Sequence, residues 1–221
     1  MSLMYTATNE SLDAIVCGLD INRDDDVLAV CGSGDQAFAI SEFANSVTAI
    51  DIHLEQIKYA AERRRYLVQE RYDCFYDLTA QEGDNVRVRN YFMTRVRRIR
   101  EKASSIKFRL FDLRNALSLG KFSKIYVSNA MGYSWRARDG RELNLSILDF
   151  MTRALDCLPV GGLFYVTNGN RVKDILDNSG AWKRLPVREE KRLTTIANNF
   201  ERNNNSGLWY PLVLKKTGEE R

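Results

Sequence analysis

Small and acidic residues stand at the ends of two apolar stretches in the first quarter of the chain. Gly32-Ser33-Gly34 follows the apolar run 27–31, and Asp51 follows the run 47–50. Two glycines let a backbone turn sharply and approach a ligand closely, and a helix that begins there offers free N–H donors. A carboxylate at the end of the next strand accepts the hydroxyls of a ribose. This spacing predicts an adenosine-binding site, while a structural turn at the glycines and a helix cap at Asp51 are the alternative interpretations.

Candidate site residues also follow two later predicted strands. Asp112 follows the strand predicted over 106–111, and its carboxylate either meets an adenine amino group or caps the segment that comes next. Tyr133 lies beyond the strand predicted over 125–128 and is a candidate catalytic residue, while an aromatic ring that packs on a cofactor is the alternative interpretation. The residues expected to bind the cofactor are Cys31, Gly32, Ser33, Gly34, Asp51, Ile52, Asp112, Leu113 and Asn129.

The composition disfavours several other kinds of protein. A single histidine, His53, and cysteines without a CxxC pair do not assemble a zinc site by spacing. A Ser-His-Asp or Cys-His hydrolase is disfavoured, because His53 would have to be its base. The start of the chain does not resemble a signal peptide, and no apolar run reaches the ~18 residues of a membrane helix. We therefore expect a cytoplasmic protein without a metal site.

Strand-like and helix-like segments alternate along the chain. Short, continuous apolar runs are typical of strands buried on both faces of a parallel sheet, and apolar residues at helical spacing separate them. The predicted strands are 27–31, 47–50, 106–111, 125–128, 163–167 and 209–215, and the predicted helices are 9–19, 35–44, 54–72, 86–103, 143–158 and 171–178. This alternation predicts an α/β fold with a Rossmann-like, mostly parallel sheet and helices on both faces. Ligands of such sheets bind beyond the carboxyl ends of the strands.

We expect one domain over residues 1–221, with a helical insert at about 66–105 after the second strand. The insert is basic between residues 86 and 103, and Arg63-Arg64-Arg65 adds to the same region, although the net charge of the whole chain is only +4. A solvated helix face is the default interpretation of such a charge run. Contact with an anionic membrane surface or with nucleic-acid phosphates is the alternative. The oligomeric state stays open.

The second half of the chain carries a resemblance to a known superfamily. Leu158-Pro159-Val160-Gly161-Gly162, between a predicted helix and the strand 163–167, resembles the L-x-P-G-G segment of S-adenosylmethionine-dependent methyltransferases. The runs 122–127 and 209–214 resemble the fourth and the last strand of these enzymes. The resemblance implies S-adenosylmethionine as the cofactor. Because Ala37 completes a G-x-G-x-x-A pattern, an NAD-linked oxidoreductase is an alternative.

A narrower resemblance lies in the first half of the chain. Tyr5, Asn9-Glu10-Ser11, the stretches 18–21, 26–37 and 47–51, and Gln56 are similar to the betaine-lipid-forming 3-amino-3-carboxypropyl transferases, which also carry a helical insert after the second strand. These enzymes use the same cofactor but transfer its amino-acid arm. The segment 128–133 departs from their pattern, so we favour methyl transfer to an unknown acceptor. Transfer of the aminocarboxypropyl group to a lipid or small molecule, and a non-catalytic module that binds the cofactor, are the alternatives.

Overall fold

A computed structural model gives the structure of most of the chain. It describes residues 3–76, 82–113, 115, 119–128, 130, 135–136, 142–143, 147–205 and 208–218. Within these residues no helix combines the length and the apolar character that crossing a membrane requires.

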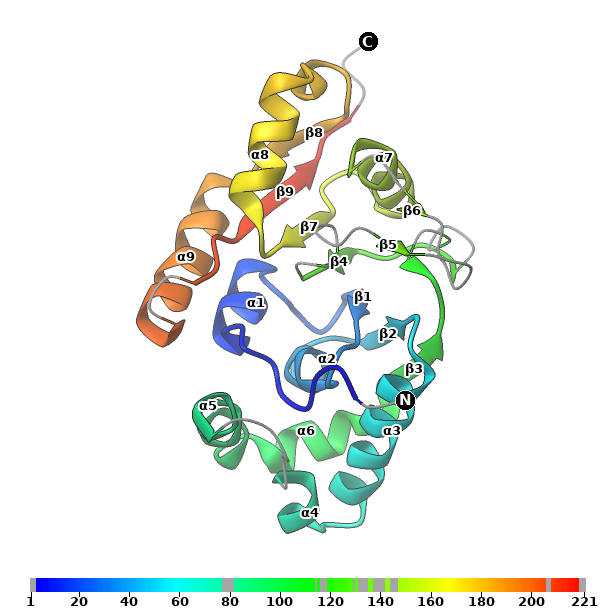
Figure 1. The fold of residues 1–221 in the computed structure, drawn as a ribbon, viewed down its shortest axis with the longest axis vertical. Helices are drawn as coiled ribbons and strands as arrows, with labels where there is room; N and C mark the ends of the chain where they lie inside the picture. Colours follow the sequence, from blue (N-terminus) through cyan, green and yellow to red (C-terminus); the bar gives the residue numbers. More distant parts are fainter. Residues whose placement is uncertain are drawn as a thin grey trace.

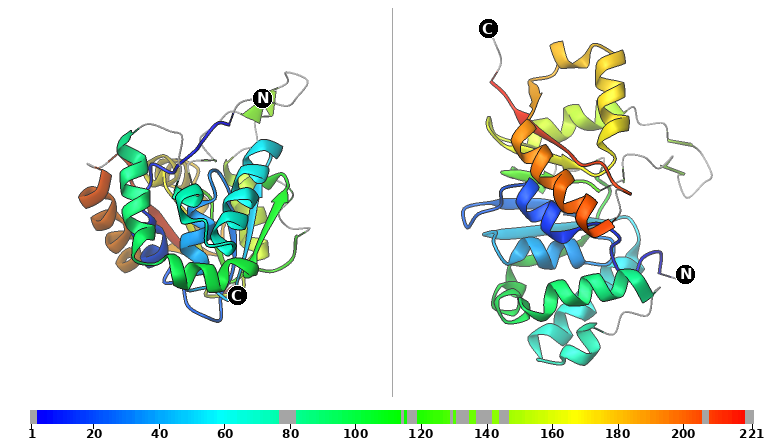
Figure 2. Two further views of the ribbon diagram at one scale, coloured as in Figure 1. Left: turned by 90° about the horizontal axis from the view of Figure 1, so that it is seen from below. Right: turned by 90° about the vertical axis from the view of Figure 1, so that its left-hand side faces the viewer.

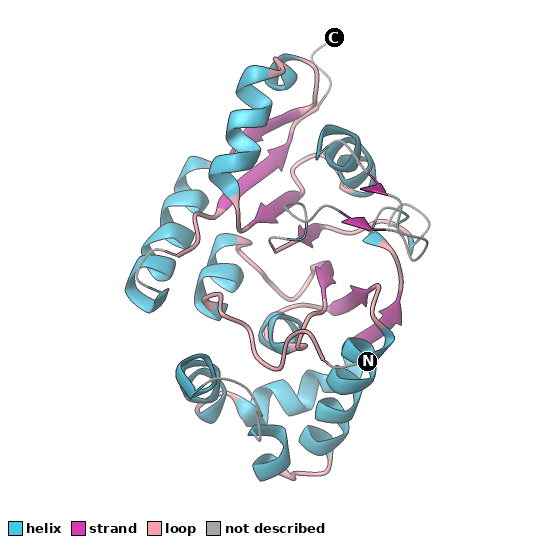
Figure 3. Cartoon of the chain, viewed as in Figure 1, coloured by secondary structure: helices cyan, strands magenta, loops and turns pink. Residues whose placement is uncertain are grey.

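A seven-stranded sheet forms the centre of the molecule (Figures 1 and 3). Its strands, in spatial order, are β3 (Ile106–Leu110), β2 (Ser46–Asp51), β1 (Asp26–Val30), β4 (Lys124–Tyr126), β7 (Leu163–Val166), β9 (Leu212–Lys216) and β8 (Val187–Glu189). The first five strands of this order run parallel, and β9 runs antiparallel to both of its neighbours. The predicted fold class, a mostly parallel Rossmann-like sheet with helices, is confirmed.

The helices connect the strands and cover the sheet, as Figure 2 shows from two further sides. The α-helices are α1 (Leu12–Gly18), α2 (Asp35–Ser41), α3 (Leu54–Val68), α4 (Tyr72–Tyr76), α5 (Glu82–Met93), α6 (Val96–Lys102), α7 (Ile147–Cys157), α8 (Gly169–Asn178) and α9 (Lys191–Asn205). Two 3-10 turns, Ala103–Ser105 and Ala181–Lys183, and a small hairpin of β5 (Trp135–Arg136) and β6 (Glu142–Leu143) complete the described elements.

Each face of the sheet has its own apolar core, because alternate side chains of the strands point to opposite faces. Val27 and Ala29 of β1 belong to one core, together with residues of α1, α2, α3, α5, α6 and α9. Leu28, between them, belongs to the other core, which includes residues of α7 and α8. Full burial of both faces explains why the central strands have continuous apolar sequences.

Several predicted boundaries are wrong. The helix predicted over 54–72 ends at Val68, because Glu70 adopts a left-handed conformation with φ of +59°. The helix predicted over 86–103 is two helices, because α5 ends at Met93 and α6 begins at Val96, and α5 begins at Glu82, four residues before the predicted start. The predictions also omitted β8 and α9, placed the start of β9 three residues too early, and assigned Leu143 to a helix although it belongs to β6.

One arginine of the predicted basic surface is buried in the interior of the protein. Arg63 is only 2% exposed, and its Nη1 donates to Asp35 Oδ1 at 2.7 Å and to the carbonyl oxygen of Ser33 at 3.0 Å. Three aromatic rings surround its guanidinium with centroid distances of 5.0–5.7 Å, and they belong to Phe38, Tyr59 and Phe75. The prediction that Arg63 contributes to a contact surface is therefore wrong.

Other basic residues of this region form ion pairs within the chain. Arg95 and Arg98 lie 3.5 and 3.0 Å from the carboxylate of Glu42, which follows α2, and Arg100 pairs with Glu70. Arg64 donates to the backbone carbonyl of Ile106 at 2.6 Å. These contacts fix α3 and α6 against the sheet and α2. Contact of the remaining charges with a membrane or a nucleic acid stays a prediction.

Replacing Arg63 by Met should destabilise the protein strongly. The variant leaves the buried carboxylate of Asp35 without its cation, and breaking a buried pair in this way costs about 3–5 kcal/mol. Arg65→Met is a matched control, because Arg65 forms an exposed pair with Glu62 and such pairs contribute about 0–1 kcal/mol. Urea unfolding followed by circular dichroism measures both variants. Equal losses of unfolding free energy would contradict the assigned role of Arg63.

Candidate functional site

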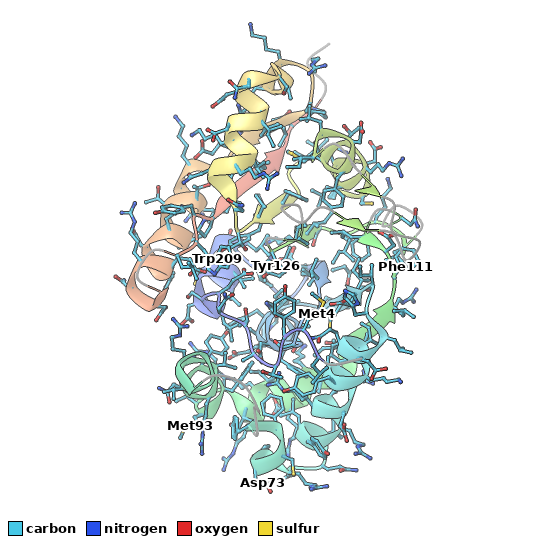
Figure 4. All side chains as sticks on the ribbon, viewed as in Figure 1. Met4, Asp73, Met93, Phe111, Tyr126 and Trp209 are labelled. Atoms are coloured by element: carbon cyan, nitrogen blue, oxygen red, sulfur yellow. The ribbon has the colours of Figure 1, made fainter. Side chains whose placement is uncertain are left out.

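A cavity of about 400 Å³ lies beyond the carboxyl ends of the parallel strands. This volume falls within the ~300–1,000 Å³ that is typical of small-molecule sites. Figure 4 labels three of its lining residues, Met4, Phe111 and Trp209. Met4 belongs to the N-terminal segment, Phe111 to the segment after β3, and Trp209 to the segment before β9. The cavity is therefore built from parts of the chain that are distant in sequence.

The glycine turn after β1 combines two different roles. Gly32 and Ser33 line the cavity, and Gly32 has a φ of +49° with open space where a Cβ would stand. Gly34 has a φ of +90° but does not line the cavity, and a Cβ there would lie 2.9 Å from the Cβ of Ala60 in α3. Gly32 thus lets the backbone border the cavity, while Gly34 lets α2 and α3 approach each other.

Asp51 lies at the end of β2 and lines the cavity beside this turn. Its Oδ2 accepts a hydrogen bond from the Gly32 backbone N–H at 3.1 Å, and its Oδ1 accepts one from the His53 N–H at 2.9 Å. Burial raises the pKa of its carboxyl group, and the two backbone donors partly oppose this. Because a carboxylate oxygen has two lone pairs, both oxygens can still accept a hydroxyl of a ligand.

The other predicted site residues divide into three groups. Ile52 and Leu113 line the cavity. Cys31 is fully buried outside the lining, and Asp112 is partly buried and also outside it. Burial raises the pKa of the Cys31 thiol. Asn129 and the catalytic candidate Tyr133 lie outside the described residues. A role in binding stays a prediction for every member of the set.

The segment before α1 forms part of the cavity wall, because side chains of α3 hold it there. Gln56 Oε1 accepts from the Met4 N–H at 2.8 Å, while its Nε2 donates to the carbonyls of Tyr5 at 2.9 Å and of Gly32 at 2.8 Å. The Tyr59 hydroxyl donates to the carbonyl of Thr6 at 3.0 Å. Gln56 therefore connects the N-terminal segment directly to the glycine turn.

Asp35, the first residue of α2, provides a second connection between the same parts. Its Oδ2 accepts from the backbone N–H of Thr8 at 2.9 Å and from the Ser33 hydroxyl at 2.6 Å, and its Oδ1 accepts from Arg63. The two carboxylate oxygens thus join the N-terminal segment, the glycine turn and α3. Asp35 itself does not line the cavity.

Glu10 is a buried acid in the wall of the cavity. It accepts hydrogen bonds from the hydroxyls of Tyr126 and Thr167, each at 2.6 Å, and from that of Ser128. Burial raises the pKa of Glu10, and the three hydroxyl donors partly oppose this shift. Ser128 follows β4 with a φ of +57°, and Thr167 follows β7. Glu10 therefore lies at the ends of these two strands.

The sequence interpretation did not predict Glu10, Gln36 or Gln56 as cavity residues. Glu10 and Gln56 carried only the narrower family resemblance, and Gln36 lay within the glycine-turn pattern without a role. Ser128 and Thr167, the last residues of two predicted strands, were an available signal, because polar groups at the carboxyl ends of such strands lie where ligands bind.

The comparisons with known proteins support the fold. No protein-family model matches the sequence, and no curated protein matches it. Among solved structures, an S-adenosylmethionine-dependent O-methyltransferase from Thermotoga maritima is 12% identical, with a TM-score of 0.55 over 95% of this chain and 66% of that one. An rRNA methylase from Streptococcus thermophilus is 10% identical, with a TM-score of 0.51 over 93% and 95%.

A third similar structure contains a ligand. It is a Streptococcus mutans protein, provisionally assigned as a methyltransferase and crystallised with S-adenosylhomocysteine. It is 12% identical to this chain, with a TM-score of 0.50 over 91% of this chain and 93% of that one. At such identities the similarity establishes a shared fold.

Alanine substitutions should separate the roles of the two glycines. Gly32→Ala should cost about 1–2 kcal/mol of stability, because only the left-handed backbone opposes the new Cβ. Gly34→Ala should cost a further ~1–3 kcal/mol, because its Cβ also overlaps Ala60. Thermal and urea unfolding of the two variants check the order. A Gly32 variant as unstable as the Gly34 variant would contradict the assignment.

Proposed function

We propose that this protein binds S-adenosylmethionine in the cavity and transfers its methyl group to an acceptor. The observation that carries the proposal is the carboxylate of Asp51, which lines the cavity at the end of β2 beside the Gly32–Ser33 turn. An acid in this position, one strand away from a glycine turn, suits the two hydroxyls of a ribose. The cavity also lies where ligands of open α/β sheets bind.

The residues present fit an adenosyl group. Asp51 would accept the ribose hydroxyls, and the apolar side chains of Ile52, Phe111 and Leu113 would border the adenine. Gly32 leaves space for close approach of the sugar to the backbone. The cofactor supplies an activated sulfonium, so the chain has to bind and orient it, align an acceptor and exclude water. Fixing the N-terminal segment with Gln56 and Tyr59 would contribute to the exclusion of water.

The three similar structures add support for methyl transfer, since they are methyltransferases or are assigned as such. In this reaction the acceptor's electron pair forms a bond to the methyl carbon, and the carbon–sulfur bond breaks to leave S-adenosylhomocysteine.

Transfer of the aminocarboxypropyl arm is a second candidate, and one observation favours it. Tyr5, Asn9, Glu10 and Gln56, which carry the narrower resemblance to the betaine-lipid-forming transferases, all line the cavity. In that reaction the acceptor attacks a carbon of the amino-acid arm instead, and methylthioadenosine leaves. The two candidates share the cofactor and differ in the product.

Asp51→Asn should weaken binding of S-adenosylhomocysteine without unfolding the protein. Replacing the charged acceptor by an amide removes charge-assisted hydrogen bonds to the ribose, which are worth about 1.5–3 kcal/mol. Isothermal titration calorimetry measures the dissociation constant. Asp174→Asn is the control, because Asp174 is exposed on α8 and does not line the cavity. An unchanged dissociation constant in the Asp51 variant would exclude this residue from the site.

The leaving group should identify the reaction. Incubation with S-adenosylmethionine and a cell extract, followed by mass spectrometry, should give S-adenosylhomocysteine above the level of the Asp51→Asn variant. Methylthioadenosine without S-adenosylhomocysteine would establish the second candidate. Binding without either product would indicate a non-catalytic module. Stabilisation by NAD alone in a thermal-shift assay would overturn the proposed cofactor, because a bound ligand raises apparent stability.

A further inference from the structure

Glu10 is a buried acid whose described partners are all neutral. Its carboxylate accepts from the hydroxyls of Tyr126, Ser128 and Thr167, and burial is the largest influence on its pKa. Within the described part of the chain, the ion pairs involve other acids. A carboxylate that is removed from water is stabilised by a countercharge, and hydroxyl dipoles supply only part of that stabilisation.

A second unsatisfied acceptor belongs to the same hydrogen-bonded group. Gln36 lines the cavity, and its side-chain Nε2 donates to the hydroxyls of Thr8 at 2.9 Å and Tyr126 at 3.5 Å. Its Oε1 is buried and accepts no hydrogen bond from the described residues. Because the Tyr126 hydroxyl contacts both side chains, Gln36 and Glu10 lie close together.

The two side chains therefore offer acceptors for a ligand that carries several N–H donors. Glu10 Oε2 accepts from two hydroxyls, whereas its Oε1 accepts from Ser128 and has a further lone pair. A ligand that donates to this oxygen and to Gln36 Oε1 would satisfy both groups. An ammonium provides three donors and the missing positive charge, whereas a sulfonium has no N–H to donate.

The separation of Asp51 and Glu10 along the edge of the sheet matches the distance between the two ends of one ligand. Asp51 ends β2, and the hydroxyls that hold Glu10 come from β4 and from the residues after β4 and β7. Since β1 lies between β2 and β4, the two acids are separated by two strand spacings, roughly 10 Å. In S-adenosylmethionine the 5′ carbon, the sulfur and a three-carbon arm separate the ribose from the ammonium, a reach of the same order.

We propose that Glu10 and Gln36 bind the ammonium group of the cofactor's amino-acid arm, with Glu10 supplying the countercharge. This inference rests on the proposed function and assigns the second end of the cofactor. Thr8, Tyr126, Ser128 and Thr167 position the two acceptors through their hydroxyls. The acid comes from the segment before α1, whereas Asp51 comes from the sheet.

The test compares two ligands that differ by one amino group. The first is S-adenosylhomocysteine, and the second is its analogue with hydrogen in place of the amino group. Calorimetry on the intact wild-type protein should show binding of the first ligand to be roughly tenfold to a hundredfold tighter, the value of a charged hydrogen bond. Glu10→Gln, which keeps the size of the side chain, should reduce this ratio to about threefold or less.

Two further variants separate loss of the ammonium contact from a general loss of binding or of folding. Asp51→Asn is the matched control, since it should weaken both ligands and preserve their ratio. Gln36→Leu should lower the ratio partly, and it serves if Glu10→Gln does not fold. Equal affinity of the wild type for both ligands, or an undiminished ratio in Glu10→Gln, would overturn the inference and leave the proposed function standing. Failure of the wild type to bind S-adenosylhomocysteine and S-adenosylmethionine would overturn both.

Discussion

The buried ion pair between Asp35 and Arg63 is the interaction on which the geometry of the cavity depends. It joins the first residue of α2 to the middle of α3, and its two side chains also contact the backbone of Thr8 and Ser33. The pair carries a desolvation cost, since both residues are almost fully buried. Aromatic faces around the guanidinium offset part of that cost. The pair therefore specifies one arrangement of the turn and the N-terminal segment.

The central strands, and the part of the cavity formed by the glycine turn and Asp51, were predictable because their signals lie in the local sequence. Strands buried on both faces produce uninterrupted apolar runs, and the glycines and Asp51 follow those runs directly. The predicted helix over 86–103 is interrupted at Arg95, which forms ion pairs with Asp13 of α1 and with Glu42 after α2, and partners so distant in sequence leave no local signal. Helix α9 was missed because its apolar residues are few, although Leu193 and Ala197 recur at helical spacing.

The part of the cavity around Glu10 and Gln56 depends on contacts that have no signal in the local sequence. The carboxylate of Glu10 meets hydroxyls 116, 118 and 157 positions away in the sequence, and Gln56 meets Met4 across 52 positions. Apolar periodicity shows which face of a helix or strand is buried, but it does not show which distant residues that face contacts. Only the strand order, which places the ends of β4 and β7 side by side, brings the three hydroxyls to one acid.

The parts of the cavity around Asp51 and around Glu10 are held in place in different ways, and ligand binding would therefore affect them differently. Asp51 is fixed by the backbone of β2 and by neighbouring N–H groups, so its position follows from the sheet. Glu10 belongs to a segment that is held by side chains, and burial opposes its ionised form. A cation bound at Glu10 would remove part of that opposition and stabilise the segment in place. In the proposed arrangement the ammonium therefore strengthens the cavity wall that encloses it, and the charge of the ligand contributes to closing its own site.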